Sequence, residues 1–242
     1  MIIIRKRPRK RRAGERAGLS PARIVAAAAQ LFEQTNAKGL SIRALAKSLG
    51  VVPTTVKSHF NGGLAEILSA IARAALAGAA RPYKPRETPA EYLGEVFFRV
   101  LEQLAGRPMT ARLVAIELSS DPLLDSFLAE RILVCLHELG AEACYFPRGL
   151  NRILGCISDM ILVECAQSDP ASRKKLKQNM VRQIAQLPPD EFPMLTKNAE
   201  GLANQAQEPA SSRLNPALAA EYAVAAVGRL KAEIAQVRRR RG

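Results

Sequence analysis

The chain has 242 residues and a formal net charge of +14, and 48% of its residues are hydrophobic. This composition allows a substantial core in one large domain or two modest ones. No run of about 18 apolar residues occurs, and the opening Met-Ile-Ile-Ile is too short for a signal peptide. We therefore expect a cytoplasmic protein without a membrane-spanning helix.

Helix is the secondary structure that the composition favours. Alanine and leucine abound, aromatic residues make up 5% and tryptophan is absent. Few stretches alternate apolar and polar residues with the period of a strand. The sequence therefore predicts an all-α fold.

The positive charge is concentrated at the two ends of the chain. Residues 1–80 carry 14 Lys/Arg and 3 Asp/Glu, residues 81–237 carry 18 and 19, and the last five residues add four arginines. A basic surface attracts a phosphate polyanion by releasing condensed counterions. The alternative interpretation is a solvated charge excess that only keeps the protein soluble.

The first 80 residues predict a basic arm followed by four helices. Residues 1–18 combine dense like charge with proline and glycine, so we expect a disordered arm. Within the expected domain at 19–80, Ser20-Pro21 begins a helix that ends near Thr35-Asn36. The remaining helices are expected at 41–49, 53–60 and 64–80.

The segment 41–60 has the pattern of a helix-turn-helix. Gly50 provides the turn, and Ala46 is small enough for the second helix to cross closely. Apolar contacts between the two helices are expected from Leu45, Leu49, Val51 and Val56. The outward residues of the second helix are short or basic, as entry into the major groove requires; they are Pro53, Thr54, Thr55, Lys57, Ser58 and His59. Two short amphipathic helices also occur in many helical proteins, but the adjacent positive charge favours DNA binding.

The rest of the chain, residues 81–242, predicts a second, larger helical domain. Two prolines in Arg81-Pro82-Tyr83-Lys84-Pro85 interrupt the helical period and indicate the boundary. Helices are expected at 88–105, 108–119, 122–140, 148–167, 170–187, 190–205 and 216–237. Residues 206–215 read as a polar loop.

The four cysteines provide no metal-binding pattern, and we expect no metal and no cofactor. No Cys-x-x-Cys pair and no histidine pair with metal spacing occurs. We expect small buried hydrophobic residues in a reducing compartment at Cys135, Cys144, Cys156 and Cys165.

Residues 20–71 resemble the DNA-binding domain of the tetracycline-repressor (TetR) family. The matching residues are Ile24, Ala28, Leu31-Phe32, Gly39-Leu40-Ser41, Leu45-Ala46, Leu49-Gly50-Val51, Thr55-Val56, His59-Phe60 and Ile67-Leu68. The resemblance implies a homodimer that represses a nearby gene and releases DNA when a small ligand binds. It also implies that Arg43 and the start of the third helix read bases and that Ser41 and His59 contact the DNA backbone.

Two positions depart from the family pattern. Lys57 stands where the family usually has tyrosine, and Leu64 stands where the family has a lysine that contacts a phosphate. The arginine-rich arm at 5–12 is a candidate replacement for that contact, along the backbone or in the minor groove; the alternative is a solvated tail.

A dimer must hold two DNA-reading heads at a fixed spacing. Apolar residues at intervals of three and four on two helices predict the interface; they are Ile153, Ile157, Val227, Leu230 and Ile234. Gly155 would allow a close helix approach. Alternatively, these faces pack only within one subunit.

A ligand cavity among the middle helices is implied by the resemblance alone. Apolar residues near those helices, together with the histidine outside the DNA-binding head, are the candidates, although most of them read equally well as core. They are Phe97, Leu101, Met109, Leu113, Ile116, Phe127, His137 and Met160.

No catalytic motif occurs, so an enzyme is not expected. The sequence thus predicts a DNA-binding transcriptional regulator, a ligand-released repressor that acts as a homodimer on a palindromic operator. The partners expected are double-stranded DNA and a small-molecule effector, without a membrane. The alternative is a basic helical protein that binds nucleic acid without sequence preference.

Overall fold

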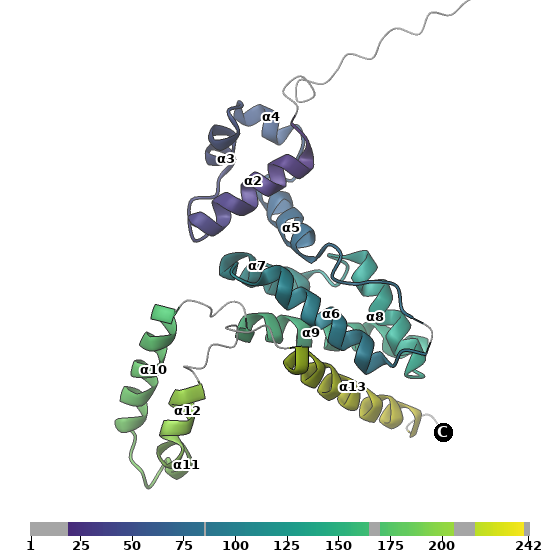
Figure 1. The fold of residues 1–242 in the computed structure, drawn as a ribbon, viewed down its shortest axis with the longest axis vertical. Coiled ribbons are helices and arrows are strands. Elements are labelled where there is room, and N and C mark those ends of the chain that lie inside the picture. Colours follow the sequence, from purple (N-terminus) through teal and green to yellow (C-terminus); the bar gives the residue numbers. More distant parts are fainter. Residues whose placement is uncertain (1–18, 85, 165–169, 206–215, 240–242) are drawn as a thin grey trace, which may run out of the picture. The chain divides into compact units, whose positions relative to one another are not determined.

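The computed structural model describes residues 19–84, 86–164, 170–205 and 216–239. These residues form α-helices and one short 3-10 helix, with no strand among them (Figure 1), so the all-α prediction is confirmed. The chain divides into two compact units, Met1–Ala74 and Ala75–Gly242. This division falls before residues 81–85, the proline-containing segment where the sequence predicted the domain boundary. The arm expected at 1–18 and the loop expected at 206–215 lie outside the described residues.

The first unit contains helices α2 (Pro21–Gln34), α3 (Ile42–Leu49), α4 (Pro53–Lys57) and most of α5 (Gly63–Leu76). The side chain of Ser20 caps α2 by accepting a hydrogen bond from the backbone N–H of Arg23 at 3.2 Å. One apolar side of each helix faces the interior. The buried residues are Ile24, Ala28, Phe32, Leu45, Ala46, Val56, Phe60, Ile67 and Ile71.

Helix α4 is shorter than expected, ending at Lys57 and not at Phe60. The hydroxyl of Ser58 donates to the carbonyl oxygen of Thr55 at 2.8 Å, and the chain then turns so that Phe60 is buried. A side chain that bonds to its own backbone competes with continued helix.

The second unit is built around α6 (Pro89–Leu104), α7 (Pro108–Ser120), α8 (Ser126–Glu138), α9 (Phe146–Glu164) and α13 (Pro216–Arg239). Helix α13 packs along α6, and α9 packs against α7, α8 and the short 3-10 helix η1 (Ala143–Tyr145). A Cβ atom at Gly94 would lie 3.4 Å from the Cα of Ala220, so a glycine lets α6 and α13 approach closely.

The segment between α9 and α13 contains α10 (Pro170–Ala185), α11 (Pro193–Lys197) and α12 (Ala199–Gln205). Helix α10 contacts both α11 and α12. The prediction of a single helix at 190–205 is therefore wrong, because α11 and α12 occupy this range. Asn198 ends α11, because its side-chain amide donates to the carbonyl oxygen of Met194 at 2.7 Å.

The segment that follows α5 is held to α6 by Arg81. Its guanidinium group binds the carboxylates of both Glu87 and Glu95, with Nε 2.7 Å from Oε2 of Glu95. Arg99 binds the other oxygen of Glu95 at 2.6 Å. The hydroxyl of Tyr92 donates to the carbonyl oxygen of Arg81 at 2.7 Å. The residues expected to form an interdomain boundary are thus part of the second unit.

The cysteine environments differ from the prediction. Cys135 is buried, and burial raises the pKa of its thiol to about 12. Cys144 is exposed and Cys156 is half-buried, so the expectation of burial is wrong for both. Cys165 lies outside the described residues. Among the residues that the structure describes, no helix has the length and apolar character needed to cross a membrane.

Candidate nucleic-acid interface

Helices α3 and α4 meet at a turn that requires glycine. Gly50 has φ 66° and ψ 31°, a left-handed conformation in which a Cβ atom is disfavoured. The N–H of Val51 donates to the carbonyl oxygen of Ala46 at 3.0 Å, which fixes the exit of the chain from α3. Leu45 and Val56 are fully buried, so the two helices are held together by apolar contact as the sequence predicted.

The outer side of the α3–α4 unit is polar and basic. Six of the eight predicted DNA-contacting residues are exposed: Ser41, Arg43, Pro53, Thr54, Lys57 and Ser58. Thr55 and His59 are half-buried. The predicted residues therefore lie on one short structural unit and mostly on its surface.

One of these side chains already has a structural role, and a polar atom of another is buried. The hydroxyl of Ser41 caps α3 by accepting a hydrogen bond from the N–H of Ala44 at 3.1 Å. The Nε2 atom of His59 is buried and has no hydrogen-bond partner within the described part of the chain. This nitrogen is not displayed on the surface, so a backbone contact by His59 would have to use another atom or a changed side-chain position.

Val52 was missed by the sequence analysis. It precedes α4 and is 62% exposed, whereas its neighbour Val51 is half-buried. An exposed apolar side chain at the start of a groove-reading helix is suited to contact with a thymine methyl group. The sequence indicated Val51 as an apolar contact between the helices and gave no role to Val52.

The electrostatic character of this surface is uniform. Residues 34–65 include four Lys/Arg and no Asp/Glu. Arg43, Lys47 and Lys57 are exposed. A surface that displays cations from a stretch without Asp or Glu attracts a phosphate backbone.

Comparison with solved structures identifies this arrangement. The Streptomyces coelicolor TetR-family protein ActR, in complex with actinorhodin, matches with a TM-score of 0.68 and 19% identity over 88% of this chain and 98% of that chain. SCO7222, a TetR from Streptomyces coelicolor, matches with a TM-score of 0.59 and 21% identity over 88% and 98%. The chain has the TetR fold. No family model and no curated protein matches the sequence.

The predicted ligand-binding residues of this TetR fold lie in different environments. Four are buried in the second unit, namely Phe97, Leu101, Leu113 and Met160, and Met109 is half-buried. Ile116, Phe127 and His137 are exposed.

The three exposed candidates do not join the four buried ones in an enclosed site. Phe127 lies under the guanidinium group of Arg131, 4.7 Å from the ring centroid. Helix α8 begins at Ser126 and not at 122, which places Phe127 in its outer first turn. Nδ1 of His137 lies 3.9 Å from the carboxylate of the exposed Glu138.

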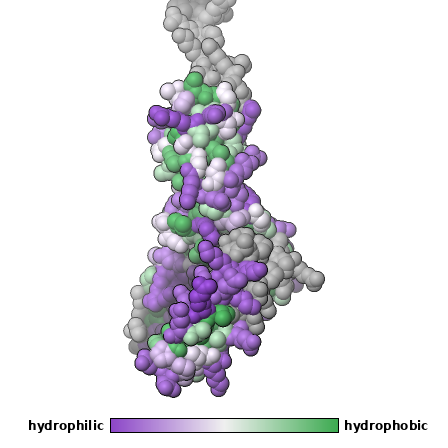
Figure 2. Space-filling view, turned by 90° about the vertical axis from the view of Figure 1, so that its left-hand side faces the viewer, coloured by the Kyte–Doolittle hydropathy of each residue, from purple (hydrophilic) through white to green (hydrophobic). Residues whose placement is uncertain are grey.

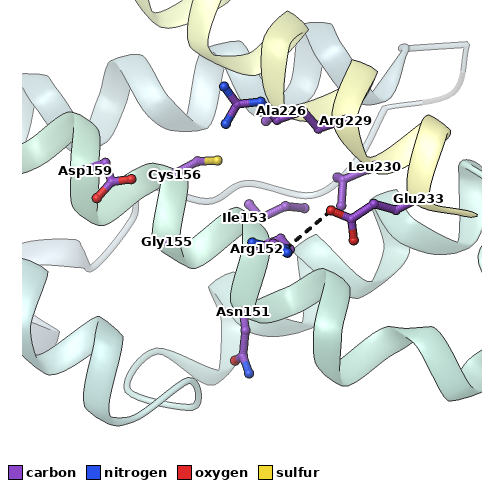
Figure 3. Close-up of a pocket in the computed structure, with 10 residues that line it drawn as sticks. All are labelled: Asn151, Arg152, Ile153, Gly155, Cys156, Asp159, Ala226, Arg229, Leu230 and Glu233. Atoms are coloured by element: carbon purple, nitrogen blue, oxygen red, sulfur yellow. Dashed lines mark ion pairs between the residues drawn. The ribbon is translucent and has the colours of Figure 1, made fainter.

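A groove between α9 and α13 was not foreseen (Figure 3). Two hollows of about 180 Å³ and about 470 Å³ share four of their lining residues, and we call their union the α9–α13 groove. The shared residues are Cys156, Asp159, Ala226 and Arg229. At one end, Glu233 of α13 binds Arg148 and Arg152 of α9 at 3.3 and 3.4 Å.

The five residues predicted for a dimer interface are buried within the second unit: Ile153, Ile157, Val227, Leu230 and Ile234. Their part in an interface between subunits stays a prediction, and two of them, Ile153 and Leu230, also line the groove. Gly155 lies there, and a Cβ atom on it would meet nothing within 4 Å.

Within the described ranges, no group of three or more His, Cys, Asp or Glu side chains could hold a metal ion.

Proposed function

We propose that the chain is a TetR-family transcriptional regulator that binds a palindromic operator as a homodimer and releases it when a small molecule binds. The observation that carries this proposal is the acid-free, exposed outer surface of α3 and α4, held on a rigid turn at Gly50. Such a surface matches the major groove in size, charge and polarity. The chemistry needed is recognition of bases and phosphates, not catalysis.

Different side chains on this surface suit different parts of DNA. Thr54 and Val52 are short and exposed at the start of α4, where side chains reach base edges. Arg43 is long enough to reach a guanine from α3, and Lys57 is suited to a phosphate. Contacts to phosphates position the protein, and contacts to bases give sequence preference.

The α9–α13 groove supports a homodimer. Gly155 of α9 and Ala225 of α13 are small residues on this side, so a second pair of helices can approach closely. Leu162 and Val163 on α9 are 40% and 49% exposed, and they add apolar surface that a partner would bury. Asp159 and Arg229 can form reciprocal ion pairs, because each contact in a two-fold interface occurs twice.

The effector is proposed to bind the second unit. The neighbour ActR has been solved with actinorhodin, and the second unit here contains the buried apolar residues Phe97, Leu101 and Met160. A ligand releases DNA only if it has unequal affinity for the DNA-bound and free states. Compounds from a metabolite panel that raise the Tm of the protein are therefore expected to include one that weakens operator binding reciprocally.

Selection of DNA sites from a random pool tests the proposed function. We expect a palindromic consensus whose two halves are bound by two subunits, with a preference of about a thousandfold or more over bulk DNA. A pool that shows no consensus while binding remains strong would support a protein that binds nucleic acid without sequence preference.

A further inference from the structure

Helix α10 is strongly basic. Its 16 residues, Pro170–Ala185, include five Lys/Arg and no Asp/Glu. Lys174, Lys175 and Arg182 are exposed, and Lys177 is half-buried. This density of positive charge lies far along the chain from the basic α3–α4 surface, and the proposed DNA recognition does not use it.

Large apolar side chains are also exposed in the α10–α12 segment. Val181 is 46% exposed and lies on the same side of α10 as Lys174 and Lys177, at spacings of seven and four. At the start of α11, the exposed fractions of Phe192, Met194 and Leu195 are 39%, 71% and 41%. In Figure 2, where the α10–α12 segment faces the viewer, hydrophilic side chains predominate and hydrophobic patches lie among them.

The combination of the two features points to a particular kind of partner. Anionic lipid headgroups attract lysine and arginine, by about fivefold in affinity for each residue near the surface. Exposed phenylalanine, methionine and leucine side chains gain by entering the boundary between headgroups and acyl chains. Duplex DNA would bind the cations but would leave these apolar side chains in water.

We propose that the α10–α12 segment binds the surface of a membrane rich in anionic phospholipids. The cations of α10 contact lipid phosphates, and the apolar residues at the start of α11 enter the headgroup boundary. The stem of Lys174 lies on the same side of α10 as Val181, so its ammonium group can stay at the phosphates while the valine enters. The segment lies on the membrane and does not cross it.

Co-sedimentation of the full chain with vesicles tests this proposal. Vesicles of phosphatidylglycerol mixed with phosphatidylcholine are compared with vesicles of phosphatidylcholine alone. The arm at 1–18 also attracts anionic vesicles, so the comparison is made between variants that all keep it. The charge variant is Lys174→Gln with Lys175→Gln, and its matched control is Lys84→Gln with Lys231→Gln, which removes the same charge from other exposed positions.

The charge variant is expected to weaken binding to anionic vesicles about thirtyfold, while the control pair changes it less than threefold. The apolar variant, Phe192→Ser with Met194→Ser, is expected to weaken it at least tenfold. All these side chains are exposed or partly exposed, and circular dichroism checks that each variant remains folded.

Two results would overturn the proposal. In the first, the charge variant weakens binding to bulk duplex DNA as much as to vesicles and the apolar variant changes neither, which would assign α10 to nucleic acid. In the second, all variants bind vesicles like the unaltered chain, which would place the lipid contact outside the α10–α12 segment.

Discussion

Lys57 lies on the exposed side of α4, three residues after the exposed Thr54. A lysine ammonium interacts with a phosphate as a point charge, and it has no fixed fork of donors that would select one base. In the proposed DNA complex, we therefore expect Lys57 to contact a phosphate and Thr54 to contact a base.

Lys57→Gln is expected to weaken operator binding by a similar factor for all sequences and to reduce the slope of log affinity against log salt by about 1. Fluorescence anisotropy at several salt concentrations measures both quantities. Lys231→Gln removes an exposed charge from α13 and is the control, with an unchanged slope. A loss confined to one base-pair position would show instead that Lys57 reads a base.

Arg81 is largely buried between two carboxylates, and its hydrogen bonds keep the pKa of Glu95 at about 2 and lower the pKa of Glu87. Removal of the guanidinium group would leave both carboxylates without their main partner. Arg81→Met is therefore expected to reduce the free energy of unfolding by about 3 kcal/mol in urea denaturation. Arg99→Met, at a more exposed pair, is expected to cost about 0.5 kcal/mol. Equal effects of the two substitutions would contradict the assigned role of Arg81.

The same site predicts a pH dependence of stability. A carboxylate whose pKa is lower in the folded chain stabilises it fully above the unfolded-state pKa of about 4.3. This contribution is lost as the pH falls from about 4.3 towards the folded pKa of Glu95, about 2. Urea denaturation between pH 5 and pH 2 is expected to show a steeper loss of stability for the unaltered chain than for Arg81→Met.

The turn between α3 and α4 depends on Gly50, which has a left-handed backbone conformation. Because a Cβ atom there would meet nothing within 4 Å, the only cost of alanine is its left-handed backbone conformation. Gly228, by contrast, is an exposed glycine with a helical backbone inside α13. A Cβ atom there would also meet nothing within 4 Å.

Gly50→Ala is expected to lower the free energy of unfolding by about 1 kcal/mol. Gly228→Ala is expected to raise it by about 0.5–1 kcal/mol, because alanine is favoured in a helix. Thermal unfolding of both variants measures the two effects. A loss of stability for Gly228→Ala as large as that for Gly50→Ala would mean that the backbone conformation at Gly50 is not the cause.

Sequence periodicity predicted that most of the helices exist, and it predicted the helix-turn-helix with its turn and most of its surface. The helix ends were harder to predict, because they depend on local hydrogen bonds. Ser58 ends α4 with its hydroxyl and Asn198 divides α11 from α12 with its amide, and both residues also occur within helices. The network of Arg81 was not foreseeable, since Glu87 and Glu95 become its partners only after α6 packs.

In the molecule as a whole, the surface that a second subunit would cover was the hardest feature to predict from the sequence. Stripes of apolar residues at spacings of three and four predict a buried side but do not show whether the same chain or a second one covers it. Ile153 and Leu230 are buried within the second unit and also line the groove, so the surface that we propose for a partner is this groove, with Gly155 and Ala225.

Gly155→Arg is expected to convert the proposed dimer to a monomer, because the new side chain would occupy the space that a second α9 needs. Light scattering after size-exclusion chromatography measures the mass. The control is Ala235→Arg, on an exposed part of α13 that does not line the groove. A Gly155→Arg protein that stays dimeric would place the interface elsewhere.

In the proposed dimer, two copies of the α3–α4 surface are held at a fixed spacing on DNA. The most direct test of this arrangement compares the affinity for the selected operator with that for the same operator carrying about five extra base pairs between its halves, which turns one half to the opposite side of the helix. A loss of about a hundredfold or more in affinity is expected. An unchanged affinity would contradict this arrangement, because each head would then bind DNA independently of the other.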